Sequence, residues 1–86
     1  MEFEEFIEQI SEKFKKANNN FDVLSKIEQD ILSFAITYEM LLMSLNENLS
    51  VSDEIKCKGK MTWLKSSLSA KYPQFKEQIQ NYKNEY

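Results

Sequence analysis

The sequence predicts an all-α protein, a small bundle of about four helices in a single domain spanning residues 1–86. The 86-residue chain contains one Gly and one Pro, which argues against a turn-rich β architecture. Its apolar residues recur at intervals of three and four, the period of an amphipathic helix. A chain this short buries only about 60–65% of its unfolded surface. We therefore expect homodimerisation to complete the bundle.

The first helix is expected near the N-terminus. Its apolar stripe has helical spacing and consists of Phe3, Phe6, Ile7, Ile10 and Phe14. Acidic residues come early in this segment and lysines late, an order that suits the helix dipole. Asn18, Asn19 and Asn20 follow. Because Asn tolerates left-handed backbone angles and also caps helix N-termini, this triplet is expected to end one helix and start the next.

The second helix is expected to be the longest and most central element, from Phe21 to Asn48. A heptad seam typical of coiled coils runs through Leu24, Ile27, Ile31, Phe34, Tyr38, Leu41 and Leu45. A second apolar set, Leu32, Ala35, Ile36, Leu42 and Met43, widens the stripe. Such a helix would be about 42 Å long. That length predicts either a kink or a second chain that covers the excess.

The stretch IKCKGKMTW, residues 55–63, alternates apolar residues and lysines as a half-buried strand does. The helical alternative uses the apolar residues Cys57, Met61, Leu64, Leu68 and Tyr72, which step by three and four. The helix accounts for more residues, and Ser50 to Asp53 fits a capping box at its start. We therefore predict a third helix, strongest over 60–71, with Gly59 as a weak point that leaves residues 53–59 open to fraying.

Tyr72-Pro73 is expected to end the third helix, because the residue before proline avoids helical angles. Proline suits the first position of a helix. A final helix is therefore predicted from Pro73 onward, with its apolar residues at Phe75, Ile79, Tyr82 and Tyr86.

Charge divides the chain into an acidic part, residues 1–54 with a net charge of −8, and a basic part, residues 55–86 with +5. Attraction between helices explains this asymmetry more simply than a nucleic-acid surface, because every basic residue is Lys and none is Arg. No signal peptide and no membrane-spanning run is recognisable. The sequence therefore predicts a cytoplasmic protein without a transmembrane segment.

The residue types argue against catalysis. There is no His and only one Cys, Cys57, so the usual general base and the usual zinc ligands are missing. No glycine-rich phosphate loop or nucleophile elbow is present. We expect no enzymatic activity, no catalytic residue, no metal and no cofactor, and we expect Cys57 to be an inert buried thiol.

Two groups of residues are candidates for binding a partner. The first is Trp63 with Lys56 and Lys60, which a helical wheel places away from the inward face of the third helix. Trp63 can instead pack within the bundle or a dimer, or stack on a base. The second group is the acidic stripe Glu5, Glu8 and Glu12. This stripe can imitate nucleic-acid phosphates, although a solvated outer face is the simpler interpretation.

The leading functional hypothesis is a small interaction protein, expected to be a homodimer, that binds and modulates another protein. A phage or prophage inhibitor of a host or defence protein is its concrete form. One alternative is a four-helix protein of the bacteriocin-immunity type that acts near the membrane; this is an analogy of fold only. The other is a nucleic-acid or nucleotide binder that uses the basic part of the chain. Methionines 40, 43 and 61 are expected to fill gaps in the core.

Overall fold

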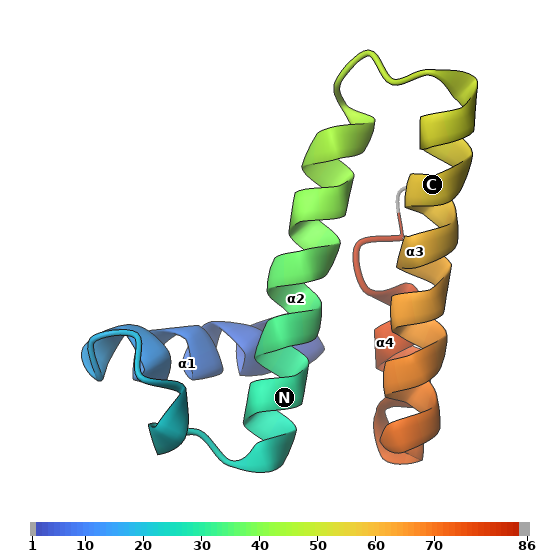
Figure 1. The fold of residues 1–86 in the computed structure, drawn as a ribbon. Helices are drawn as coiled ribbons and strands as arrows, with labels where there is room; N and C mark the ends of the chain where they lie inside the picture. The colour runs from blue at the N-terminus through green and yellow to red at the C-terminus, as the bar shows by residue number, and fades with distance from the viewer. Residues whose placement is uncertain (1, 85–86) are drawn as a thin grey trace.

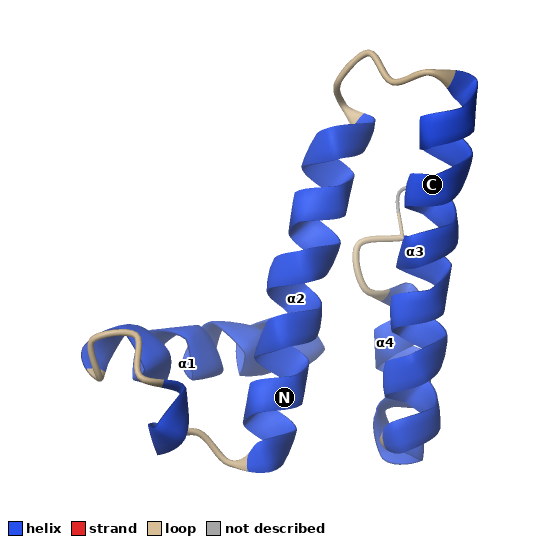
Figure 2. Ribbon diagram, in the orientation of Figure 1, coloured by secondary structure: helices blue, strands red, loops and turns tan. Residues whose placement is uncertain are grey.

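All regular secondary structure in residues 2–84, the part that the computed structural model describes, is helical (Figure 2). The prediction of an all-α chain with four helices is thereby confirmed. The α-helices are α1 (Phe3–Lys16), α2 (Lys26–Leu45), α3 (Val51–Lys71) and α4 (Lys76–Asn81), with 3₁₀ turns η1 (Phe21–Val23) and η2 (Pro73–Phe75).

The helices form two layers (Figure 1). Helices α2 and α3 pack side by side as an antiparallel hairpin joined by residues 46–50. Helix α1 packs against α2 and crosses behind it, and the short α4 packs against α3 on the same side. One side of the α2–α3 hairpin is thus covered by α1 and α4.

The asparagine triplet acts as predicted at the end of α1. Asn18 and Asn19 have φ values of 56° and 62°, the left-handed region that ends a helix. The Asn20 side chain accepts a 3.0 Å hydrogen bond from the Asp22 backbone N–H and thereby caps η1. The triplet therefore turns the chain from α1 into the approach to α2.

The predicted span of the second helix was wrong at both ends. Residues 21–23 form η1, and α2 begins at Lys26 because Ser25 and Glu28 make a capping box. Helix α2 ends at Leu45 after 20 residues, about 30 Å. It is one residue shorter than α3, so it is not the dominant helix. Helix α2 is therefore too short to require a kink or coverage by a second chain.

Residues 55–63 lie within α3, which runs without a break over 21 residues. The helical interpretation of this stretch is confirmed. Residues 53–59, which the sequence left open, are also helical, and α3 has no break at Gly59. The Ser50 side chain accepts a 3.2 Å hydrogen bond from the Asp53 backbone N–H, which fixes the start of α3. A Cβ atom at Gly59 would meet no atom within 4 Å. Gly59 is therefore an ordinary position on an open side of the helix.

The turn at Tyr72-Pro73 also follows the prediction. Tyr72 has φ −127° and ψ 74°, outside the helical region, and Pro73 starts η2, which leads into α4. Ile79 and Tyr82 are buried and Phe75 is partly buried, as their spacing predicts. Tyr86 lies outside the described residues.

The core is centred on an aromatic junction. The ring of Tyr82 lies 5.8 Å from Phe3, 5.5 Å from Phe34 and 5.6 Å from Tyr38, measured between centroids. These contacts join the chain after α4 to α1 and α2. Aromatic pairs at these distances contribute about 0.5–1.5 kcal/mol each beyond the area they bury. The two layers are therefore joined through Tyr82.

The predicted heptad seam of the second helix faces this core, and all of its members are buried or partly buried. Cys57 is buried as expected, and its thiol donates to the Leu41 backbone carbonyl at 3.3 Å. The methionine expectation holds for Met61 only. Met40 and Met43 are exposed by 62% and 69% because they lie on the outer side of α2.

Candidate functional site

Trp63 is the most conspicuous exposed side chain of α3. Two thirds of its surface, 66%, is accessible. The inward positions of this helix are taken by Cys57, Met61 and Leu68, which are buried. Trp63 points away from them because helical side chains advance about 100° per residue. The structure therefore rules out Trp63 as a core residue of a single chain.

Lys56 and Lys60 share the outer side of α3 with Trp63. Together with Ser67 these residues follow one another at intervals of four, three and four, and all are exposed. We call this set the Trp63 stripe. Among residues 2–84, neither Lys56 nor Lys60 takes part in an ion pair, whereas the neighbouring Lys58 pairs with Glu54 at 3.2 Å. The positive charge on the stripe is therefore available to an external group.

A shallow groove of about 260 Å³ runs beside Trp63 between α2 and α3. We call it the Trp63 groove. It has apolar walls and a polar rim, and it is lined by Asp30, Ser33, Phe34 and Thr37 from α2 and by Trp63, Leu64, Ser67, Leu68 and Lys71 from α3. No lining residue comes from α1 or α4, so this side of the hairpin is its open side.

Asp30 organises one end of the groove. Its carboxylate accepts a 2.6 Å hydrogen bond from the Tyr72 hydroxyl and pairs with Lys71 at 2.7 Å and with Lys26 at 3.2 Å. Burial by itself would raise the pKa of the Asp30 carboxyl. The contacts with Lys71, Tyr72 and Lys26 outweigh it and lower the pKa to about 2. At neutral pH, Asp30 is thus ionised, and it forms one end wall of the groove together with Lys71.

The acidic stripe lies elsewhere. Glu5, Glu8 and Glu12 are all exposed on α1. None of them lines the Trp63 groove. The structure brings Lys56, Lys60 and Trp63 together on one helix and keeps the three glutamates together on another. The two predicted groups are therefore separate surfaces.

Of the α3 residues that the sequence singles out, Trp63 lines the groove and Lys56 and Lys60 do not. The α2 side of the groove was not predicted. Asp30, Ser33 and Thr37 recur at intervals of three and four on a helix that is otherwise mostly apolar. The spacing of these three polar residues predicts that they share one solvent-facing edge of the helix, and it was the sequence signal for the α2 side of the groove. The pairing of that edge with Ser67 and Lys71 is a long-range contact that periodicity within one helix does not reveal.

Comparison of the chain with known protein families, curated protein sequences and solved structures finds no match. None of the helices within residues 2–84 has the length and apolar character that crossing a membrane requires.

Proposed function

We propose that the protein is a non-enzymatic interaction module that binds a partner protein through the Trp63 stripe and the adjoining Trp63 groove. The observation that supports this most strongly is the 66% exposure of Trp63 on the open side of the α2–α3 hairpin. Leaving an indole ring in water forgoes a large hydrophobic gain, and Trp is enriched at the energetic centres of interfaces. The partner has an apolar pocket for the indole and carboxylates around its rim.

Trp63 supplies most of the affinity in this proposal. A central Trp contributes about 2 kcal/mol or more when it is buried at an interface. Lys56 and Lys60 contribute less, because exposed ion pairs yield roughly 0–1 kcal/mol each. Their main effect is on the association rate and on the choice of an acidic partner. The Asp30 carboxylate at the end of the groove is already paired with Lys71 and Lys26, so it leaves the positive charge of Lys56 and Lys60 undiminished.

We also propose that the chain forms a homodimer through a different surface, the outer side of α2. Ile36, Met40 and Met43 lie there at intervals of four and three, and they are 43%, 62% and 69% exposed. Three large apolar side chains in helical register are typical of a helix–helix interface. Such a dimer leaves Trp63 free for the partner.

In its concrete form, the proposal is a small inhibitor encoded by a phage or prophage that works in the bacterial cytoplasm. It would block a host or defence protein by covering part of its surface. A composition rich in Asn, Ile, Lys and Tyr, as AT-rich genomes produce, supports such an origin. The identity of the target is decided by experiment.

The test compares Trp63→Ala with Ile55→Ala. Ile55 is a matched control because it is 65% exposed on the same helix but lies outside the Trp63 stripe. The unaltered protein serves as bait in host lysate, and any captured protein is then purified and titrated against the unaltered protein and both variants. Trp63→Ala is expected to weaken the measured affinity about 30-fold, the equivalent of about 2 kcal/mol. Ile55→Ala is expected to bind as the unaltered protein does.

Two results would contradict the proposal. Equal weakening by both variants would show that the contact is not centred on Trp63. Sedimentation equilibrium supplies the second: a dimer that Trp63→Ala dissociates while Met43→Lys leaves it intact would make Trp63 an assembly residue. The expected result is the opposite, with Met43→Lys monomeric and Trp63→Ala still dimeric.

A further inference from the structure

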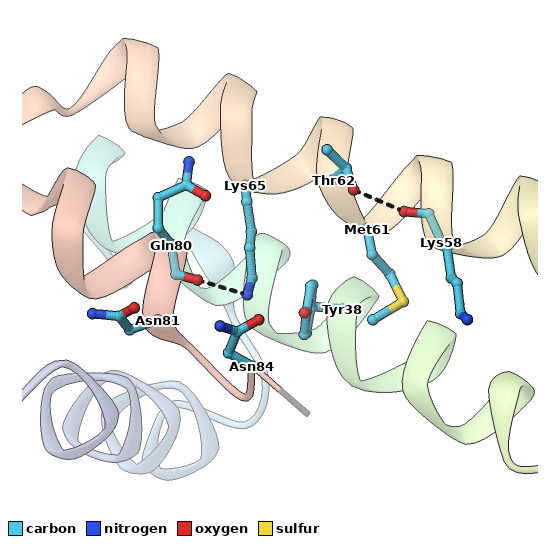
Figure 3. A pocket seen from close by; sticks show the side chains of 8 residues that line it. All are labelled: Tyr38, Lys58, Met61, Thr62, Lys65, Gln80, Asn81 and Asn84. Atoms are coloured by element: carbon cyan, nitrogen blue, oxygen red, sulfur yellow. Dashed lines mark hydrogen bonds between the residues drawn. The ribbon is translucent and has the colours of Figure 1, made fainter. Parts of the chain in front are cut away.

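A second cavity, of about 450 Å³, lies between α3, α4 and α2 (Figure 3). The α3 residues that line it include Thr62 and Lys65. The Trp63 groove is lined by the other edge of α3, which carries Ser67 and Lys71. The volume of the second cavity is in the range of small-molecule sites, about 300–1,000 Å³. This cavity is therefore distinct from the Trp63 groove, and it does not depend on the proposed function.

Lys65 is the unusual residue of this cavity. It is 7% exposed, although lysine is almost never buried without a partner of opposite charge. Its ammonium donates a 3.0 Å hydrogen bond to the Gln80 backbone carbonyl and lies 4.9 Å from the centre of the Tyr38 ring. Among residues 2–84, no carboxylate pairs with it. Burial lowers the pKa of the Lys65 ammonium, which is the cost of an uncompensated charge.

The rest of the lining suits a ligand that is anionic at one end and apolar at the other. Among the described residues, 2–84, no Asp or Glu lines the cavity. In Figure 3 the Asn84 side chain lies beside the Lys65 ammonium and the Asn81 side chain lies farther away; the amides of both residues can donate hydrogen bonds. Tyr38 and Met61 are buried and offer ring and thioether surface on the other side.

The charge balance selects the kind of anion. Lys58 also lines the cavity, but its ammonium pairs with Glu54 at 3.2 Å. One positive charge, on Lys65, is therefore left to neutralise. A single negative charge matches it, and a carboxylate carries one such charge on two oxygens that can accept from an ammonium and an amide together. A phosphate dianion would bring an excess negative charge.

We propose that this cavity binds a small organic acid, with its carboxylate on Lys65 Nζ and the amides of Asn81 and Asn84 and its apolar body against Tyr38 and Met61.

The experiment uses hexanoate, benzoate and inorganic phosphate as probes, with benzamide as the uncharged counterpart of benzoate and sodium chloride at matched ionic strength. Binding is followed in ¹H–¹⁵N spectra through the side-chain amides of Asn81 and Asn84. Lys65→Met keeps the length of the side chain and removes the charge. Lys76→Met is the matched control, because Lys76 is exposed on α4 and does not line the cavity.

The expected result is saturable binding of both carboxylates, at least tenfold weaker in Lys65→Met and unchanged in Lys76→Met, with benzamide and chloride inactive. Equal binding of benzamide and benzoate, equal weakening by the two Lys variants, or no saturable carboxylate response would overturn the proposal. Binding of phosphate in preference to carboxylates would overturn the assigned ligand class. If Lys65→Met does not fold, Asn84→Ala takes its place, with the same loss expected.

Discussion

The Tyr72 hydroxyl donates a 2.6 Å hydrogen bond to Asp30 Oδ2, across 42 positions of the chain. This contact joins the end of α3 to the first turns of α2, and Lys71 reaches the same oxygen at 2.7 Å. The α2 and α3 walls of the open groove are thereby joined at one end. Asp30 and Lys71 also line the Trp63 groove, so this cluster forms part of its wall.

Removing the Tyr72 hydroxyl is expected to raise the pKa of Asp30. In the unaltered protein that pKa is about 2, against an ordinary value of 3.8. Tyr72→Phe deletes one of the hydrogen bonds that favour the carboxylate, so its pKa moves back toward 3.8. Carboxyl ¹³C shifts of Asp30 followed over pH measure the change. An unchanged titration midpoint in Tyr72→Phe would show that this bond is not made in solution.

The same carboxylate is expected to support the fold in mild acid. Its pKa is lower in the folded chain than in the unfolded one, so its contribution is complete above about pH 4 and is lost as pH falls toward 2. Because the pair with Lys71 is partly open to solvent, we expect about 1 kcal/mol rather than the full value of the shift. Urea unfolding at pH 6 and pH 2.5 tests this, with Asp30→Asn expected to lose less stability on acidification. Equal losses would contradict it.

The helices themselves were largely predictable. The 3–4 spacing of apolar residues located all four, and Asn18–Asn20, Ser50 and Pro73 marked boundaries that the structure retains. The start of α2 was misplaced because the apolar seam extends back to Leu24, which is buried although it precedes the helix. Periodicity does not distinguish a buried linker residue from a helical one, whereas the Ser25–Glu28 capping box does.

Replacing Gly59 with Ala is expected to stabilise the protein by about 0.5–1 kcal/mol. Gly59 lies within α3 at helical angles, and an added Cβ meets nothing within 4 Å. Ala therefore restricts the unfolded chain without a clash in the folded one. Urea denaturation followed by circular dichroism gives the free energy of unfolding. A destabilised Gly59→Ala variant would mean that α3 is broken at this position, as the sequence alone allowed.

Lys65 is expected to make stability rise with pH in the alkaline range. Its pKa is lowered in the folded chain by burial, so the unfolded chain binds more protons between the folded pKa and the ordinary value of 10.5. The penalty for burying the charge is therefore relieved as pH rises. Tyr38 and Lys58 also face this cavity, but they are present both in the unaltered protein and in the Lys65→Met variant, so their titration is common to the two.

The measurement is urea unfolding of the unaltered protein and Lys65→Met at pH 7.5 and at pH 9.5. The free energy of unfolding of the unaltered protein minus that of Lys65→Met is expected to be larger at pH 9.5 than at pH 7.5. If this difference is the same at both pH values, or is smaller at pH 9.5, burial of the Lys65 charge does not destabilise the folded chain.

The candidate site residues were predictable only where one helix carries them. Lys56, Lys60 and Trp63 share a face of α3, so the wheel found them together. The groove also needs Asp30 and Thr37 from α2, and the second cavity needs Gln80 and Asn81 from α4. Lys65 lies four residues after Met61 and three before Leu68, on the inward side of α3. A lysine at such a position was a signal of a buried charge, but what surrounds it depends on the docking of α4.

The most direct test of the central claim is the fluorescence of Trp63, the only Trp in the chain, in the free protein across a wide range of concentration. We expect an emission maximum and an acrylamide quenching constant close to those of the urea-unfolded chain, at every concentration, because the open side of the hairpin is uncovered even in a dimer. Blue-shifted, protected emission that turns red on dilution would contradict the account, since it would mean that a second copy already occupies the Trp63 stripe.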